Sequence, residues 1–259
     1  MGIKSDRKVR VGCSGWSYSH WKGQFYPEDL PHKQWFSFYA KTFDTVEINS
    51  TFYRLLAESV FKGWAAKAPE GFIYAVKASR YITHVNKLRN TREAVERLLS
   101  RARLLGEHLG PILYQLPPSL KCDLGRLEVF LDTLPDDLMH VFEFRNPTWY
   151  KEDTFRLLEQ KGASLCAHDL RRAESPRKAV GPLAYVRFHG PERRYHGAYS
   201  EQALADWARW LKAEARAGRN IYAYFNNDVE AQAVCDAQTL RKMIRGAGKR
   251  RRVAVAYND

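Results

Sequence analysis

Long apolar runs are missing from this 259-residue sequence, which excludes an ordinary membrane-spanning helix. No stretch approaches the roughly 20 consecutive apolar residues that such a helix needs. The first ten residues, MGIKSDRKVR, also lack the apolar centre of a secretory signal peptide. We therefore predict a cytoplasmic protein with no membrane partner.

Cysteines are few and widely scattered, which argues against a disulfide framework. They are Cys13, Cys122, Cys166 and Cys235, and no C-x-x-C pair occurs. The motifs H-x-x-x-H and H-E-x-x-H are also absent, and so is a G-x-G-x-x-G fingerprint after the first predicted strand. We expect reduced thiols and predict no cofactor, with a divalent metal kept as a minor alternative.

Acidic residues are outnumbered, since 29 Asp and Glu accompany 42 Lys and Arg for a formal net charge of +13. Seven basic residues lie between Arg241 and Arg252, where no acidic residue occurs. More than half of the excess charge therefore belongs to the C-terminal end. Excess positive charge suits anionic partners, but it also simply keeps a protein soluble.

Eight short runs rich in β-branched and aromatic residues predict eight strands. Their starts are on average about 30 residues apart, which is the length of one β-α unit. The runs are Val9–Cys13, Thr45–Asn49, Ile73–Lys77, Pro111–Leu116, Val141–Arg145, Ser164–His168, Ala184–His189 and Ile221–Asn226. Segments with helical spacing of apolar residues lie between several of them, such as the stripe of Leu98, Leu99, Ala102 and Leu105.

Alternating strands and helices favour parallel strands, and eight such units close into a (β/α)8 barrel. We predict a single TIM-type barrel over residues 1–245, followed by a basic tail over residues 246–259. An open doubly wound sheet is the alternative, but it usually has fewer strands and carries the glycine fingerprint that this sequence lacks. The segment from Asp169 to Leu183 contains Pro176 and Pro182, so we expect the helix between strands six and seven to be missing or reduced.

Alternation along each strand predicts which side chains point into the barrel, because neighbouring residues face opposite sides and the helix-facing side should be apolar. The inward polar residues all lie in the C-terminal halves of their strands or just beyond, where barrel enzymes keep their active sites. They are Glu47, Asn49, Lys77, Gln115, Glu143, Arg145, Arg187, His189, Tyr224 and Asn226, with Ser14 and His168 on weaker patterns. Because buried charges need partners, this set either binds something or forms a salt-bridge network that fills the barrel.

Seven motifs along the chain resemble, in the same order, those of the YecE-like family, also called domain of unknown function 72. They are GCSGWSYSHWKGQFYP (12–27), FDTVEINSTFYRL (43–55), FIYAVKASRYITH (72–84), ILYQLPPS (112–119), FEFRNPTWY (142–150), YVRFHG (185–190) and YAYFNND (222–228). The resemblance covers residues 9–245 and implies a TIM-barrel-like fold, in agreement with the strand count. It implies no particular reaction, because the family has no settled activity, and residues 246–259 fall outside the shared pattern.

Glu47 and Glu143 come from nearly opposite walls of the predicted barrel, so their carboxylates could act as a catalytic acid and base. Each could equally be an ion-pair partner of a neighbouring Lys or Arg. With His168, Asp169 and His189 they also have the chemistry of metal ligands, as in metal-dependent barrel nucleases. Adjacent cations would repel a divalent ion, so we assign no residue to a metal.

The inward cations Lys77, Arg145 and Arg187 suit a phosphate or carboxylate ligand, because guanidinium groups offer forked donors and lysine a point charge. In this hypothesis the cations hold the anion, one of the two glutamates moves protons, and His189 orients or assists. Lys77 could instead form a Schiff base if it is desolvated. Lys77 and His189 therefore join the glutamates as predicted catalytic residues.

Further residues complete the predicted substrate-binding site. We expect contacts from Asn49, Gln115, Tyr224 and Asn226 beside Arg145 and Arg187. Aromatic rings follow the first, second and fifth strands, and most should pack under the loops as large aromatics usually do. Trp16 and Tyr53 are the two that we expect to contact a sugar or base.

The sequence thus predicts an enzyme that acts by acid/base chemistry on an anionic substrate, such as a phosphorylated sugar or a nucleotide. Two alternatives stay open: a nucleic-acid-binding module without turnover, and a metal-dependent phosphodiesterase or nuclease. The basic tail would bind nucleic acid through counterion release, without sequence preference and with a steep salt dependence. The alternative for the tail is a solvated end with no partner.

Overall fold

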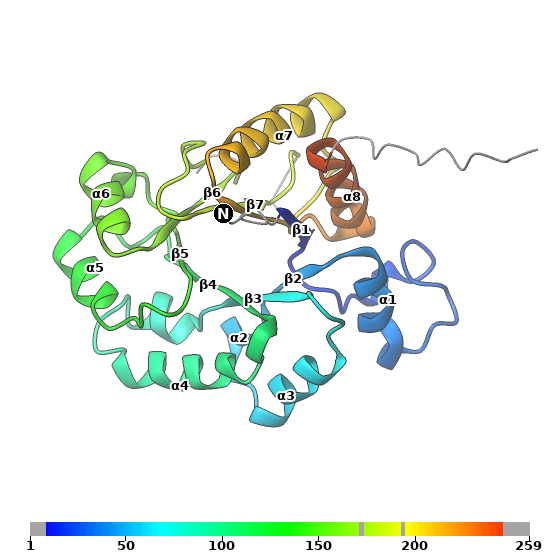
Figure 1. The fold of residues 1–259 in the computed structure, drawn as a ribbon, viewed down its shortest axis with the longest axis horizontal. Coiled ribbons are helices and arrows are strands. Elements are labelled where there is room, and N and C mark those ends of the chain that lie inside the picture. Colours follow the sequence, from blue (N-terminus) through cyan, green and yellow to red (C-terminus); the bar gives the residue numbers. More distant parts are fainter. Residues whose placement is uncertain (1–8, 171–173, 193–194, 246–259) are drawn as a thin grey trace, which may run out of the picture.

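Eight parallel strands form a closed barrel in the computed structural model, which describes residues 9–170, 174–192 and 195–245 (Figure 1). The strands are β1 Val9–Cys13, β2 Thr45–Ile48, β3 Ile73–Lys77, β4 Leu109–Gln115, β5 His140–Glu143, β6 Ser164–His168, β7 Leu183–Phe188 and β8 Asn220–Phe225. Each strand pairs with the next, and β8 returns to pair with β1. The predicted TIM-type barrel is confirmed, and every predicted strand overlaps an observed one.

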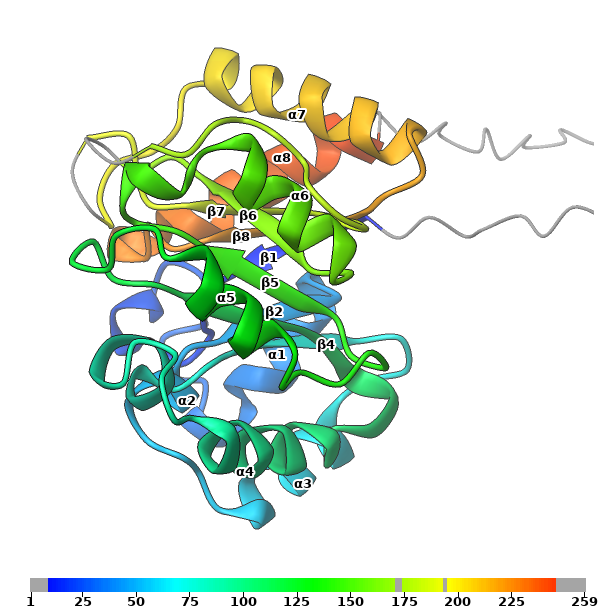
Figure 2. The same ribbon diagram turned by 90° about the vertical axis from the view of Figure 1, so that its left-hand side faces the viewer.

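Helices cover the outside of the barrel (Figures 1 and 2). They are α1 Trp35–Thr42, α2 Ser50–Tyr53, α3 Glu58–Lys67, α4 Arg92–Arg103, α5 Leu124–Leu131, α6 Glu152–Gln160, α7 Glu201–Arg216 and α8 Gln232–Arg245. The described part of the β6–β7 connection, residues 169–170 and 174–182, contains no helix, as the prolines there predict. Within the described ranges, no helix is both long and apolar enough to cross a membrane.

Short helical turns connect several of these elements. Five are 3₁₀ turns, at Ser19–Trp21, His32–Gln34, Gly106–His108, Pro147–Trp149 and Val229–Ala231. One turn of π-helix, Tyr81–Val85, follows β3. It lies after the C-terminal end of β3, beside α2, where the ring of Phe52 contacts that of His84 at 5.0 Å between centroids.

Apolar side chains form separate layers outside and inside the barrel. Val46, Ile48 and Val76 pack outward with the helices, as alternation along the strands predicts. A smaller cluster fills the barrel centre: Ala75, Leu113, Val141, Cys166, Leu183, Tyr185, Tyr222 and Tyr224. This cluster is the dry floor beneath the polar residues at the C-terminal strand ends, and electrostatic interactions above such a floor are stronger than in water.

Gly12 in β1 shows how closely the barrel packs against its surroundings. A Cβ atom here would lie 2.3 Å from the carbonyl oxygen of Thr45 and 2.9 Å from the hydroxyl of Tyr39. We expect Gly12→Ala to lower the free energy of unfolding by about 1–3 kcal/mol, the usual cost of overpacking. Gly63 in α3 is the control, because a Cβ there meets nothing within 4 Å, and Gly63→Ala should stabilise by about 0.5–1 kcal/mol. Equal urea midpoints for the two variants would contradict this packing.

The C-terminal end of α8 lies at the opposite pole of the barrel from the strand ends that carry the polar residues. Arg245 donates a hydrogen bond of 3.2 Å to the carbonyl of Val9, where β1 begins. Arg241 donates to the carbonyl of Thr42, also below the strands. These two basic residues therefore hold α8 against the barrel. The tail, residues 246–259, lies outside the described residues, and its nucleic-acid binding stays a prediction.

Candidate active site

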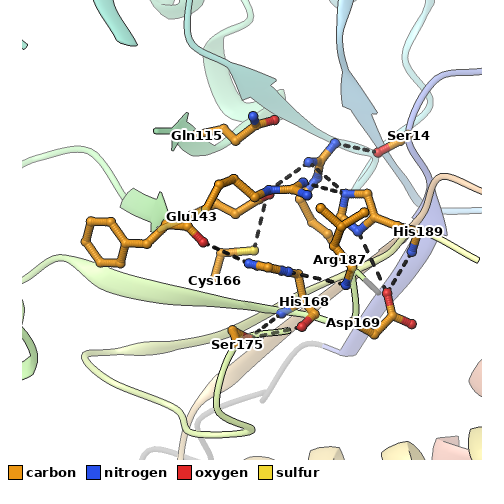
Figure 3. A network of polar contacts seen from close by, with 12 residues as sticks. Ser14, Gln115, Glu143, Cys166, His168, Asp169, Ser175, Arg187 and His189 are labelled. Atoms are coloured by element: carbon orange, nitrogen blue, oxygen red, sulfur yellow. Dashed lines mark hydrogen bonds and ion pairs between the residues drawn. The ribbon is translucent and has the colours of Figure 1, made fainter. Parts of the chain in front are cut away.

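Seven polar side chains meet inside the barrel at the C-terminal strand ends, and Gln115, Glu143, Arg187 and His189 among them are labelled in Figure 3. They are Glu47, Lys77, Gln115, Glu143, Arg145, Arg187 and His189, and we call them the polar ring. All seven are buried, with exposed fractions from 0% for both glutamates to 8% for Lys77 and Gln115. Its least buried members, Lys77, Gln115 and Arg145, lie at the C-terminal ends of β3, β4 and β5.

Arg187 occupies the centre of the polar ring and binds both carboxylates. Its Nη2 and Nε donate to Glu47 Oε1 at 2.8 and 3.0 Å, and its Nη1 donates to Glu143 Oε2 at 2.8 Å. Tyr185 donates to the other oxygen of Glu47 at 2.6 Å, and Ser14 donates to Oε1. Burial opposes charge on the guanidinium, but the two carboxylates outweigh it and hold the pKa of Arg187 well above its usual value. Arg187 and its two carboxylate partners therefore form a fully buried ion-pair triad.

Arg145 joins this triad from the end of β5. It forms an ion pair with Glu143 and donates to Nε2 of His189 at 2.7 Å. Burial disfavours the Glu143 carboxylate, but Arg145 and Arg187 outweigh it and hold its pKa well below the usual range. Because an arginine can only donate, Nε2 of His189 must accept, and its proton lies on Nδ1, 3.8 Å from Asp169. Burial, with the two arginines, keeps the pKa of His189 well below its usual value, so the imidazole is neutral.

Lys77 differs from the other cations because its partner is uncharged. Its Nζ donates to Gln115 Oε1 at 2.7 Å and lies 4.3 Å from the centroid of the Phe52 ring. Among the described residues, no carboxylate lies within ion-pair distance of this nitrogen. Burial, helped by the charge on Arg187, lowers the pKa of Lys77 from 10.5 to about 7. Since two arginines already balance two glutamates, the ring is neutral when the amine of Lys77 is neutral.

A second polar branch leads from His189 toward α7. Asp169 accepts the backbone N–H of His189 at 2.8 Å and the hydroxyl of Tyr199. Next to it, the ring nitrogen Nε2 of His168 lies 2.9 Å from the Phe144 carbonyl. Burial lowers the pKa of His168 to about 4 and raises that of Asp169 to about 6. At neutral pH the His168 imidazole is therefore neutral, whereas Asp169 is still mainly ionised and becomes neutral only below a pH of about 6.

The raised pKa of Asp169 makes a testable contribution to stability. The folded protein binds this proton more tightly than the unfolded chain does, so the stabilisation is present in acid and is lost as pH rises through about 6. Asp169→Asn removes the ionisation. The difference in unfolding free energy between this variant and the unsubstituted protein should change with pH. We expect it to shift in favour of the variant by roughly 2 kcal/mol from a pH of about 4 to a pH of about 8. Urea titrations at the two pH values measure it, and a difference that did not change with pH would contradict it.

Three further predicted residues are not among the seven side chains of the ring. Strand β2 ends at Ile48, and the backbone of Asn49 is helical. The side-chain Nδ2 of Asn49 donates to the Ser14 carbonyl at 3.3 Å, so this side chain does not join Glu47 in the ring. Tyr224 faces inward as predicted but lies in the floor rather than at the mouth, fully buried, with its hydroxyl 2.7 Å from that of Thr45. Asn226 follows the end of β8, half-buried, where its backbone N–H donates to the Phe188 carbonyl.

The two aromatic residues expected to contact a ligand also lie apart from the ring. Trp16 packs outside the barrel, edge-on to Phe36 with ring centroids 5.5 Å apart. Tyr53 at the end of α2 is 74% exposed and contacts the ring of Phe52. Phe52 contacts both Tyr53 and the amine of Lys77, so Tyr53 lies one side chain away from the ring. Trp16 instead lines a cavity outside the barrel.

Sequence reasoning missed Tyr185, which binds Glu47 from the floor. A signal existed, because Tyr185 precedes Arg187 by two residues and so faces the same side of β7. It also missed Tyr199, which follows β7 in a loop, where strand periodicity gives no information. The described residues contain no group of three or more His, Cys, Asp or Glu side chains placed to hold a metal ion.

Comparison with known sequences identifies the family of this barrel. Residues 10–256 match the family described as protein of unknown function DUF72. The chain belongs to the DUF72 family. The match confirms the resemblance seen in the motifs and extends beyond residue 245, where we expected that resemblance to end.

Two relatives of this DUF72 protein carry UPF0759 names. The UPF0759 protein YunF of Bacillus subtilis (strain 168) is 22% identical over 274 residues, which cover 91% of this chain and 94% of YunF. The UPF0759 protein YecE of Escherichia coli (strain K12) is 30% identical over 145 residues. That alignment spans 54% of this chain and 53% of YecE, about half of each.

Solved structures of DUF72 proteins share the barrel. One from Thermotoga maritima has a TM-score of 0.84 and 29% sequence identity, and the match covers 92% of this chain and all of that protein. One from Enterococcus faecalis has a TM-score of 0.79 at 19% identity, covering 97% of each chain. These likenesses support the fold, and the chemistry has to be argued from the polar ring.

Proposed function

We propose that this DUF72 protein is an enzyme that transfers protons on an anionic substrate at the mouth of its barrel, with Lys77 as the proton-transferring group. The observation that supports this most is the environment of Lys77: a buried amine bound to a neutral amide, beside two arginines and two glutamates whose charges balance. A pKa of about 7 suits a general base, because the amine can accept and return a proton at physiological pH.

The contacts of the two glutamates favour a positioning role over proton transfer. Glu143 binds two arginines, and its lowered pKa makes it a weak base. Glu47 already accepts from Arg187, Tyr185 and Ser14. In this proposal both carboxylates fix Arg187, and the proton transfer assigned to them from the sequence passes to Lys77.

The anionic group of the substrate would bind on the more open side of the ring, at Arg145 and Lys77. Arg145 Nε is buried and has no hydrogen-bond partner among the described residues, so it can still donate to a phosphate or carboxylate. A negative charge bound there would raise the pKa of Lys77 by direct attraction. Substrate binding would therefore help the amine to take up the proton that it removes.

Phosphorylated sugars and nucleotides are the substrates that fit this proposal. Proton transfer to and from carbon can be followed without knowing the product, by incubating the protein with a panel of such compounds in D2O. Mass spectrometry then detects uptake of deuterium. The proposal expects exchange into at least one phosphorylated compound and none into its unphosphorylated counterpart. Equal exchange into both would contradict the role of the anion, and no exchange across the panel would contradict the proposed reaction.

A further inference from the structure

A cavity lies outside the barrel, between α1, α2 and α3, and we call it the outer pocket. Its volume of about 560 Å³ is in the usual range for small-molecule sites. Its walls are mainly apolar, formed by Trp16, Phe36, Leu56, Val60 and Trp64. None of the polar-ring residues lines it, so the outer pocket and the ring are separate places in the fold.

The aromatic wall of the outer pocket is held in place by packing. Trp16 lies edge-on to Trp64 with ring centroids 5.8 Å apart, and edge-on to Phe36 at 5.5 Å. Trp64 in turn contacts Phe61 of its own helix at 5.2 Å. Rings fixed in this way offer a preformed surface to a flat apolar ligand, with little loss of side-chain freedom on binding.

The charges around the outer pocket are all positive. Lys33, Arg54 and Lys67 line it, and no aspartate or glutamate does. Within the described chain, none of the three forms an ion pair, whereas Lys62 on the same helix as Lys67 pairs with Glu58 at 3.7 Å. Three unpaired cations around an apolar cavity create a potential that favours an anion.

A hydrogen-bond acceptor is available at the inner end of the outer pocket. Asn49 lines the cavity, and its amide nitrogen contacts the Ser14 carbonyl. Its Oδ1 is buried and has no partner among the described residues. A buried acceptor without a partner is costly, and a ligand with an N–H or O–H group would remove that cost.

We propose that the outer pocket binds a small aromatic molecule that carries an acidic group, a phosphate or carboxylate, and a hydrogen-bond donor on its ring. The aromatic body packs against Trp16 and Trp64, the acidic group lies among the three cations, and the donor meets Asn49. This site is independent of the proton transfer proposed for Lys77. Its test uses binding alone, so the two proposals can fail separately.

Two fluorescent probes with the same aromatic body separate the apolar and ionic parts of this proposal. One is 8-anilino-1-naphthalenesulfonate, and the other is N-phenyl-1-naphthylamine, which lacks the sulfonate. Val60→Trp fills the cavity and should abolish binding of both. Substituting Lys33, Arg54 and Lys67 together by Gln should weaken the sulfonate about tenfold, the combined effect of three exposed ionic contacts, and leave the neutral probe unchanged.

Lys62→Gln is the matched control, because Lys62 is an exposed lysine on α3 that does not line the outer pocket. It should change the binding of neither probe, and circular dichroism with thermal melting would establish that every variant is folded. If a folded Val60→Trp variant bound both probes as tightly as the original protein, the site would lie elsewhere. If the triple substitution weakened both probes equally or neither, the anionic part of the proposal would be overturned. Displacement of the sulfonate by aromatic phosphates but not by aromatic carboxylates, or the reverse, would identify the acidic group.

Discussion

Arg187→Met is expected to lower the free energy of unfolding by about 3–5 kcal/mol, because it leaves two buried carboxylates without their shared partner. Arg187 is 1% exposed and binds Glu47 and Glu143 at 2.8 Å each. Methionine has a similar volume, so the loss comes from the uncompensated charges rather than from a cavity. Urea unfolding near neutral pH measures the change. The loss should shrink in acid, because Glu143, whose pKa Arg187 helps to hold low, becomes protonated in the variant and no longer needs this cation.

Arg103→Met is the matched control for this prediction. Arg103 donates two hydrogen bonds to Asp137, but the two side chains are 46% and 60% exposed. An exposed ion pair contributes little because water screens it, so this substitution should lower the unfolding free energy much less than Arg187→Met does. Adding Glu47→Gln to the Arg187→Met variant should recover part of the lost stability, because it removes one of the stranded charges. Equal losses for the two arginine variants would show that Arg187 is not the centre of a buried triad.

Lys77→Met is expected to reduce proton exchange into the substrate at least about 100-fold, the usual contribution of a positioned general base. Methionine keeps the apolar stem of the side chain beside Phe52 but has no group that can accept a proton. The rate of deuterium uptake in D2O, with whichever compound the screen identifies, measures the effect. Thermal melting of the variant shows whether the barrel remains folded.

Lys77→Arg separates proton transfer from simple attraction of the anion. A guanidinium keeps its charge at all accessible pH values, so this variant should bind an anion but still lose exchange. Lys41 on α1 is exposed, and Lys41→Met should have no effect. Retention of exchange by Lys77→Arg within about twofold would contradict the assignment of Lys77 as a general base.

Much of the fold and of the polar ring could be predicted from the sequence because both depend on the twofold periodicity of strands. Apolar residues such as Phe142 and Val186 show which alternate positions of their strands face the helices. Their neighbours Glu143 and Arg187 then have to face inward. The spacing of the runs fixes the number of units. Periodicity is a local property, so it survives in the sequence without knowledge of the neighbours of each residue.

Pairing inside the ring could not be predicted, because it depends on distances between strands that are far apart in the sequence. Counting charges gives three cations against two glutamates, but only the structure places Arg187 between both carboxylates and Lys77 beside Gln115. The low pKa of Lys77 follows from that placement and from burial.

The direction of side chains at strand ends could not be predicted from the sequence either. Asn49 follows Glu47 by two residues and would face the same side if the strand continued. The strand ends one residue before it, however, and the backbone turns into α2. Side chains alternate between the two faces only while a strand continues. The end of a strand is therefore where a prediction from alternation is least reliable. Trp16 was selected as a ligand contact for its place after β1, and its cavity between α1 and α3 became visible only in three dimensions.

The pKa of the Lys77 amine tests the central claim most directly. Competitive labelling of amines with acetic anhydride over a range of pH, followed by mass spectrometry of the peptide that contains Lys77, gives the midpoint of its titration. The exposed Lys41 serves as an internal standard. We predict a midpoint of about 7 for Lys77, and an increase when inorganic phosphate is added. A midpoint at the ordinary value of 10.5, with or without phosphate, would contradict the neutral amine and with it the proposed proton transfer.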